Sequence, residues 1–126
     1  MKPQDIKAAY AAHKALNVLE AELSKLEDMA ARIETNEAYN EVFRSYKLGI
    51  VMKDIRYYKA RIAEEKPKLE RALSWAEEAP DQIREIIRLR VIKLKSWASI
   101  SAELFGSQEQ NTAYMRLKRY LDSSQD

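Results

Sequence analysis

Apolar residues recur at intervals of three and four through the first third of the chain. The positions are Ala9, Ala12, Leu16, Leu19, Leu23, Leu26, Ala30 and Ile33. This spacing gathers them on one side of a helix, in the heptad pattern of a coiled coil. We expect the helix to begin near Pro3, because proline fits a first turn, and to end at Thr35 and Asn36, where either residue can cap a new helix.

A second apolar stripe predicts a helix from about residue 37 to about residue 65. Its positions include Val51, Ile55, Tyr58 and Ile62, and the spacing recurs at Leu69, Ala72 and Ala76. Lys66 and Pro67 interrupt it, since proline lacks an amide proton and disfavours helix in the preceding residue. We therefore expect a kink or a short break there, with a helix resuming through Trp75.

Two antiparallel helices alone do not make a large core. Either they pack on the rest of the chain as an intramolecular bundle, or the heptad seam pairs with a second copy. A seam beside a basic module favours the homodimer, and the bundle stays an open alternative. The residues expected at the oligomer interface are Leu16, Leu19, Leu23, Leu26 and Ile33.

A domain boundary is expected where proline follows the second helical region, at Ala79 to Asp81. It separates a helical hairpin or coiled-coil region, residues 1–79, from a second domain, residues 80–126. The predicted fold class is therefore all-α: a long N-terminal helical hairpin or coiled coil, followed by a C-terminal three-helix helix-turn-helix unit.

Three short amphipathic helices are predicted in that second domain. With their caps they are 82–94 after Asp81, 97–105 after Ser96, and 107–121 beginning at Ser107 or Gln108. Gly106 supplies the left-handed geometry that ends the middle helix. The expected inward residues are Ile83, Ile86, Ile87, Val91, Leu94, Trp97, Ile100, Ser101, Leu104, Ala113, Leu117 and Leu121, with Tyr120 alongside.

Basic residues gather in the same domain, although the net charge of the chain is only +2. Residues 82–95 hold five bases and one acid, and residues 110–121 hold three bases and none. Clustered bases are what neutralisation of DNA phosphates requires. The alternative is that the first basic run is simply a solvated helix face.

The outward side of the last predicted helix carries side chains that suit a major groove. Amide side chains bond adenine edges, arginine bonds guanine, and methionine or threonine contacts a thymine methyl group. The predicted DNA-binding residues of this helix are Gln108, Asn111, Thr112, Met115, Arg116, Lys118 and Arg119. Arg84, Arg88 and Lys95 are expected to flank the groove.

The core and cap residues of this domain carry a family resemblance. They are Ile86-Ile87-x-Leu89-Arg90, Ser96-Trp97-x-x-Ile100, Leu104-x-Gly106 and Arg119-Tyr120-Leu121. Over residues 81–121 the pattern resembles the helix-turn-helix of small phage and prophage regulators, which are similar to region 4 of sigma factors and to late-gene activators of the ArpU and RinA type. The resemblance implies double-stranded DNA and RNA polymerase as partners. It implies no particular DNA sequence.

Composition excludes several kinds of chemistry. There is no cysteine, which fits a reducing cytoplasm, and His13 is the only histidine, so a multi-histidine metal site is ruled out. His13 is expected at an exposed or seam position. No apolar run is long enough to span a bilayer, and no signal-peptide pattern opens the chain. We expect a cytoplasmic protein that is not an enzyme and has no cofactor, metal or small-molecule substrate, because it lacks a phosphate-binding glycine loop and a nucleophile paired with a base.

The favoured hypothesis is a sequence-specific transcription regulator of phage or mobile-element type, dimeric, with helix 107–121 in the major groove. A small DNA-packaging protein, similar to a terminase small subunit, is the first alternative, since it also joins such a motif to a helical oligomerisation region. The second is a helical interaction or inhibitor protein that keeps the fold without DNA binding.

Overall fold

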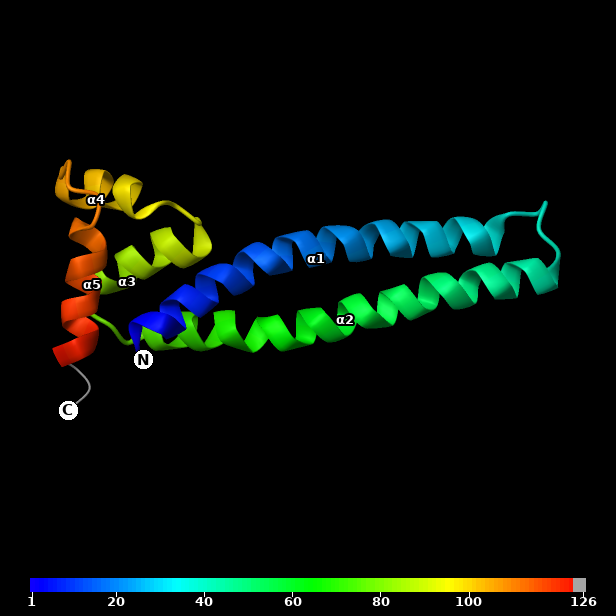
Figure 1. Ribbon diagram of the computed structural model, residues 1–126, viewed down its shortest axis with the longest axis horizontal. Coiled ribbons are helices and arrows are strands. Elements are labelled where there is room, and N and C mark those ends of the chain that lie inside the picture. Colours follow the sequence, from blue (N-terminus) through cyan, green and yellow to red (C-terminus); the bar gives the residue numbers. More distant parts are fainter. Residues whose placement is uncertain (124–126) are drawn as a thin grey trace. The chain divides into compact units, whose positions relative to one another are not determined.

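The computed structural model describes residues 1–123, and all the secondary-structure elements in that part of the chain are helices. The elements are α1 (Pro3–Thr35), α2 (Glu41–Glu77), α3 (Asp81–Ile87), the π-helical turn η1 (Arg88–Ile92), α4 (Trp97–Phe105) and α5 (Thr112–Ser123), as Figure 1 shows. The expectation of an all-α fold is confirmed.

Contacts divide the chain into two compact units. One comprises residues 15–65, and the other joins residues 1–14 to the chain from residue 66 onward. We call them the hairpin unit and the motif unit. The structure groups the residues differently from the boundary expected at 79/80, because Ala76 and Ala79 are buried in the same core as Ile83 and Ile86.

The later part of the heptad seam packs inside the hairpin unit, whereas Ala9 lies in the core of the motif unit. Ala30 and Ile33 of α1 form a buried cluster with Val51 and Ile55 of α2. Further apolar residues pack against that cluster: Leu23, Leu26, Tyr39 and Leu48. Of the five residues expected at an oligomer interface, Leu16 and Ile33 are buried and Leu19, Leu23 and Leu26 are half-buried. This part of the seam thus packs against α2 of the same chain, as expected of a helical hairpin.

The turn between α1 and α2 is longer than expected, and α2 begins at Glu41 instead of near residue 37. The Asn40 side chain accepts the amide hydrogen of Phe43 at 2.8 Å and so caps α2. Asn36, one of the two expected caps, accepts the amide hydrogen of Ala38 at 2.9 Å and closes a turn instead. The two asparagines thus have different roles: Asn36 accepts an amide hydrogen within the turn, and Asn40 accepts one from the first turn of α2.

Of the two outcomes expected at Lys66 and Pro67, a kink or a short break, the short break does not occur, because α2 continues through Pro67 to Glu77. Proline removes one backbone hydrogen-bond donor from the helix. The apolar stripe of the same helix nevertheless continues past it into the core of the motif unit. Beyond the proline, Ala72 and Ala76 are buried and Leu69 packs against them. The burial of these residues favours a continuous helix and outweighs the tendency of Lys66 and Pro67 to end it.

The motif unit is built around residues from all its helices. The core runs from Ile6 and Ala9 of α1 to Leu117 and Leu121 of α5. Its largest fully buried side chains are Ile86, Ile87, Ile100, Leu117, Leu121, Val91 and Ser101. The inward faces expected from spacing are confirmed at these positions. Tyr120 lies alongside the core, with its ring centroid 5.9 Å from that of Trp75.

The first helix of the motif differs from expectation at both ends. Pro80 occupies the N-cap position, and Asp81 is the first helical residue, bonded to Arg84 instead of capping. At the other end, the helix widens into a π-helical turn at residues 88–92, so Leu94 lies beyond it with φ +57°. Leu94 is half-buried and is not part of a helical face.

A contact from α1 accompanies that widened turn. The His13 ring donates from Nδ1 to the carbonyl oxygen of Val91 at 2.6 Å. His13 is half-buried, whereas the sequence suggested an exposed or seam position. A π-helical turn leaves carbonyl groups out of the ordinary helix pattern, and His13 satisfies one of them.

Candidate nucleic-acid interface

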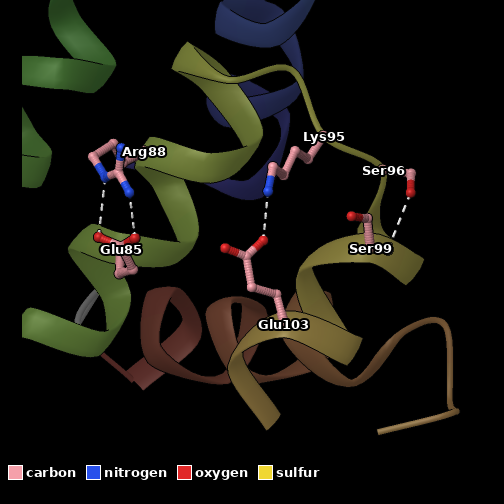
Figure 2. A network of polar contacts seen from close by, with 6 residues as sticks. All are labelled: Glu85, Arg88, Lys95, Ser96, Ser99 and Glu103. Atoms are coloured by element: carbon pink, nitrogen blue, oxygen red, sulfur yellow. Dashed lines mark hydrogen bonds and ion pairs between the residues drawn. The ribbon is translucent and has the colours of Figure 1, made fainter. Parts of the chain in front are cut away.

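The helix-turn-helix geometry rests on the two predicted caps of α4. The Ser96 hydroxyl accepts the amide hydrogen of Ser99 at 3.1 Å, as Figure 2 shows. Gly106 adopts φ +59° at the other end, where its amide bonds the carbonyl of Ala102 at 3.0 Å. The expected cap and the expected left-handed glycine are both confirmed.

A buried serine joins α4 to α5. The Ser101 hydroxyl accepts the amide hydrogen of Ala113 at 3.0 Å and donates to the carbonyl oxygen of Gln110 at 3.2 Å. Ala113 lies in the first turn of α5, where backbone amides lack helical partners. Ser101 is therefore a cap supplied by a neighbouring helix, and it fixes the start of α5 against α4.

The last helix begins later than the sequence predicted. It starts at Thr112, so Gln108 and Asn111 lie in the turn that precedes it. The Ser107 hydroxyl lies 2.8 Å from the Thr112 hydroxyl and accepts the amide hydrogen of Glu109 at 3.1 Å. This hydrogen-bonded turn, not a helical turn, holds residues 107–111 because it satisfies their polar groups locally.

A shallow hollow of about 300 Å³ opens at the start of α5. Five predicted DNA-binding residues and one acid line it: Asn111, Thr112, Met115, Arg116, Arg119 and Glu109. Asn111, Met115 and Arg119 are exposed, whereas Thr112 is half-buried and its hydroxyl bonds the carbonyl of Glu109 at 3.3 Å. The structure thus brings most of the predicted reading residues together on one surface.

Gln108 and Lys118 are exposed but do not line that hollow. Lys118 faces a second cavity on another side of α5. Gln108 lies in the turn. The predicted reading face is therefore narrower than the seven predicted residues suggested.

Arg116 has partners within the motif unit. It donates to the Gln82 side chain of α3 at 3.0 Å, and its guanidinium lies over the Phe105 ring, 5.3 Å from the centroid. An exposed arginine held in this way is pre-organised, so fewer rotamers are lost if it meets a partner. It also links α5 to α3 and α4.

The three flanking bases are each paired with an acid. Arg84 bonds Asp81 at 2.7 Å, Arg88 bonds both carboxylate oxygens of Glu85, at 3.0 and 2.5 Å, and Lys95 bonds Glu103 at 2.6 Å. Figure 2 shows the last two pairs. These pairs reduce the positive charge that the first basic run offers to phosphate.

The Glu85–Arg88 pair alters the titration of both groups. The hydrogen bond from Arg88 lowers the pKa of Glu85 below its usual value. The same bond raises the pKa of Arg88. Both side chains are more than a third exposed, so solvent screens the pair and it stabilises the fold only modestly.

Two features of this surface escaped sequence reasoning. Glu109 places a carboxylate in the hollow, just outside the acid-free run that starts at Gln110. Its position in a polar turn beside the predicted helix was the available signal. Arg90 was counted only as a base, but it stacks between aromatic rings inside the motif unit. No spacing rule pairs it with Tyr10, which is far away in sequence.

No family model matches the chain, and comparisons with curated proteins and with solved structures found no match either. Within residues 1–123, no helix is both long and apolar enough to cross a membrane. The same residues contain no cluster of three or more acidic or histidine side chains suited to a metal ion.

Proposed function

We propose that this protein is a sequence-specific, double-stranded DNA-binding transcription regulator of phage or mobile-element type, acting in the cytoplasm as a homodimer without catalysis. One observation carries the proposal. Five side chains chosen for groove recognition gather in one exposed hollow at the start of α5. Buried residues support that helix from beneath, because Ala113, Leu117 and Leu121 anchor it in the core.

The chemistry of the hollow suits a major groove. Asn111 offers a donor and an acceptor for an adenine edge, and Met115 offers an apolar contact for a thymine methyl group. Arg119, one helical turn beyond Met115, has no ion-pair partner among the described residues and suits a phosphate or a guanine. Glu109 adds an acceptor that fits a cytosine amino group and disfavours a phosphate.

The dimer in this proposal uses a face that the hairpin unit leaves uncovered. Apolar side chains on the outer side of α2 are 41% to 81% exposed: Val42, Phe43, Tyr46, Ile50 and Tyr57. They extend over about 24 Å of helix. A contiguous exposed apolar patch marks an interaction site more often than an idle surface. Since Ala30 and Ile33 of the heptad seam already pack against α2, we assign this stripe to a second copy.

Two copies joined in this way would present two reading helices to two half-sites. A twofold contact uses the same patch on both copies, as one stripe on one helix allows.

The proposal is tested by fluorescence anisotropy with a pool of random-sequence duplexes, from low to moderate salt. The double variant Asn111→Ala/Arg119→Ala should weaken binding at least tenfold. It should also reduce the slope of the logarithm of the binding constant against the logarithm of salt concentration by about one. Lys93→Ala is the matched control, because the Lys93 side chain is exposed, has no ion-pair partner among the described residues, and does not line the hollow. It removes one charge but should weaken binding to the pool far less than the double variant does.

Three results would contradict the proposal. If no duplex binds at low salt, the motif fold serves a helical interaction protein instead. If the double variant binds like the wild type, α5 is not the reading helix. If the native mass in solution is that of a ring of many copies, a DNA-packaging role replaces regulation.

A further inference from the structure

The motif unit contains a second, larger cavity on a different side of α5 from the reading hollow. Its volume is about 360 Å³, at the small end of the range typical of ligand pockets. The lining residues come from the first turns of α1, from η1, from the start of α4 and from α5. The lining residues are Pro3, Gln4, Ile6, Lys7, Arg90, Trp97, Tyr114, Leu117, Lys118 and Leu121.

The lining combines an apolar body with positive charge. Six of the ten residues are aliphatic, aromatic or proline, three are cationic, and none is acidic. The cations Lys7, Arg90 and Lys118 come from α1, η1 and α5. Elsewhere in the motif unit the bases Arg84, Arg88 and Lys95 each bond an acid. No described carboxylate forms an ion pair with the three cations of the cavity, so their charge is available to a bound anion.

Arg90 is the fixed member of the three. Its guanidinium lies 3.7 Å from the centroid of the Tyr10 ring and 4.8 Å from that of Trp97. Nη1 donates to the carbonyl oxygen of Lys95 at 2.9 Å. Such a clamp holds an arginine in one orientation while leaving other guanidinium hydrogens free for an acceptor.

The charge on Arg90 is only partly compensated. Burial lowers the pKa of Arg90, which means that its surroundings disfavour the charged form. Aromatic faces and one carbonyl offset part of that cost. A bound anion would offset more of it and would form charge-assisted hydrogen bonds in a partly water-excluded site.

We propose that this cavity binds a small amphipathic anion, a carboxylate on an aliphatic or aromatic body. The carboxylate lies against Arg90 and between Lys7 and Lys118, and the body lies against Ile6, Leu117 and the aromatic rings. A free inorganic anion would leave the apolar walls wet, and a neutral apolar molecule would leave the cations without a partner. The cavity chemistry calls for both parts in one molecule.

This proposal is independent of DNA binding. The cavity lies on another side of α5 from the hollow, and the two share no lining residue. A ligand would nevertheless touch α5 through Tyr114, Leu117 and Lys118. It would thereby connect the first turns of α1 to the helix that we assign to recognition.

The test is a titration of the full chain, labelled with ¹⁵N, with octanoate, 1-octanol and inorganic phosphate at constant ionic strength. Octanoate should shift the backbone amides of Lys7, Leu117 and Lys118 and the indole of Trp97 in a saturable way. The other two probes should bind at least tenfold more weakly. Trp75 provides an internal reference, because its indole belongs to the same unit but does not line the cavity.

Two variants distinguish binding in the cavity from nonspecific attraction of the anion to a basic protein. Lys7→Gln/Lys118→Gln should weaken octanoate binding at least tenfold without unfolding the protein, since both lysines are exposed. The control Lys2→Gln/Lys93→Gln removes the same charge from exposed positions outside the cavity and should change binding less than twofold. Arg90 is left intact in these variants because it also holds Lys95.

Three outcomes would overturn the proposal. Octanol binding as tightly as octanoate would show an apolar crevice without anion recognition. Phosphate saturating the same resonances would show an anion site without an apolar component. Equal losses in the cavity and control variants, or shifts spread over the surface, would show nonspecific attraction.

Discussion

The Ser101 hydroxyl of α4 accepts the amide hydrogen of Ala113, the second residue of α5, across 3.0 Å. Both residues are fully buried. A single polar atom in the core therefore defines where the last helix starts and how it crosses its neighbour. Because the exposed residues of α5 follow from that start, the position of the candidate reading surface depends on this hydrogen bond.

Replacing Ser101 by alanine should destabilise the protein by about 1–3 kcal/mol, because the buried amide of Ala113 would lose its acceptor. Alanine is smaller than serine, so no clash contributes. Urea unfolding followed by circular dichroism measures the loss. Ser99→Ala is the matched control on the same helix, because Ser99 is exposed and contributes its backbone, not its hydroxyl, to the α4 cap. Equal stability of Ser101→Ala and wild type would contradict the cap.

Gly106 provides a second test of the turn. Its φ of +59° strains any side chain, but no atom lies within 4 Å of the position that a Cβ atom would occupy. Gly106→Ala should therefore cost about 1 kcal/mol from backbone strain alone. Gly106→Asn should cost less, because asparagine tolerates the left-handed region better. Thermal unfolding of the two variants side by side checks the order; a larger loss for asparagine would argue against this geometry.

The core and caps of the motif were predictable because they obey local rules. Spacing alone identified Ala113, Leu117 and Leu121, and residue type alone identified Ser96 and Gly106. Helix starts were less predictable, since several polar residues compete as caps. The actual helices α2 and α5 begin at Glu41 and Thr112, a few residues after the expected positions. Those competitions are decided by tertiary contacts such as Ser101 to Ala113.

The partners of the basic residues also fall into two groups, those predictable from sequence spacing and those that depend on the packed structure. Arg84 and Arg88 bond acids three residues before them, a spacing that the sequence displays and that helix geometry explains. Lys95 bonds Glu103 across a turn between helices, and Arg90 stacks on Tyr10 from another helix. These pairs required the packed structure. A base count from sequence therefore overstated the charge available for phosphate.

The Glu85–Arg88 pair predicts a pH dependence. Because the pKa of Glu85 is lowered in the folded state, its contribution is complete above the unfolded pKa and disappears as pH falls through the folded pKa. Wild type should thus exceed Glu85→Gln in melting temperature near neutral pH, and the gap should close in acid. About 0.5 M salt should narrow it too. In an Arg88→Gln background the pH-dependent gap should vanish; its persistence there would assign the effect to another group.

The exposed stripe on α2 predicts how the protein assembles. Tyr46 and Ile50, 68% and 50% exposed, lie on the face that we assign to a second copy. Tyr46→Glu/Ile50→Glu should shift sedimentation from dimer to monomer, because two carboxylates would be buried at the contact without partners. Val18→Glu is the control: Val18 is 63% exposed on α1 of the same unit, so it receives the same kind of change outside the stripe.

Helical content by circular dichroism should be unchanged in both proteins, since none of these side chains lies in the cluster of Ala30, Ile33, Val51 and Ile55. A wild-type protein that sediments as a monomer at all concentrations, or a stripe variant that stays dimeric, would remove the stripe from the proposal. If Val18→Glu breaks the dimer instead, the dimer interface would be assigned to α1. If the stripe variant is monomeric and folded, its DNA affinity should also fall, because one reading helix replaces two.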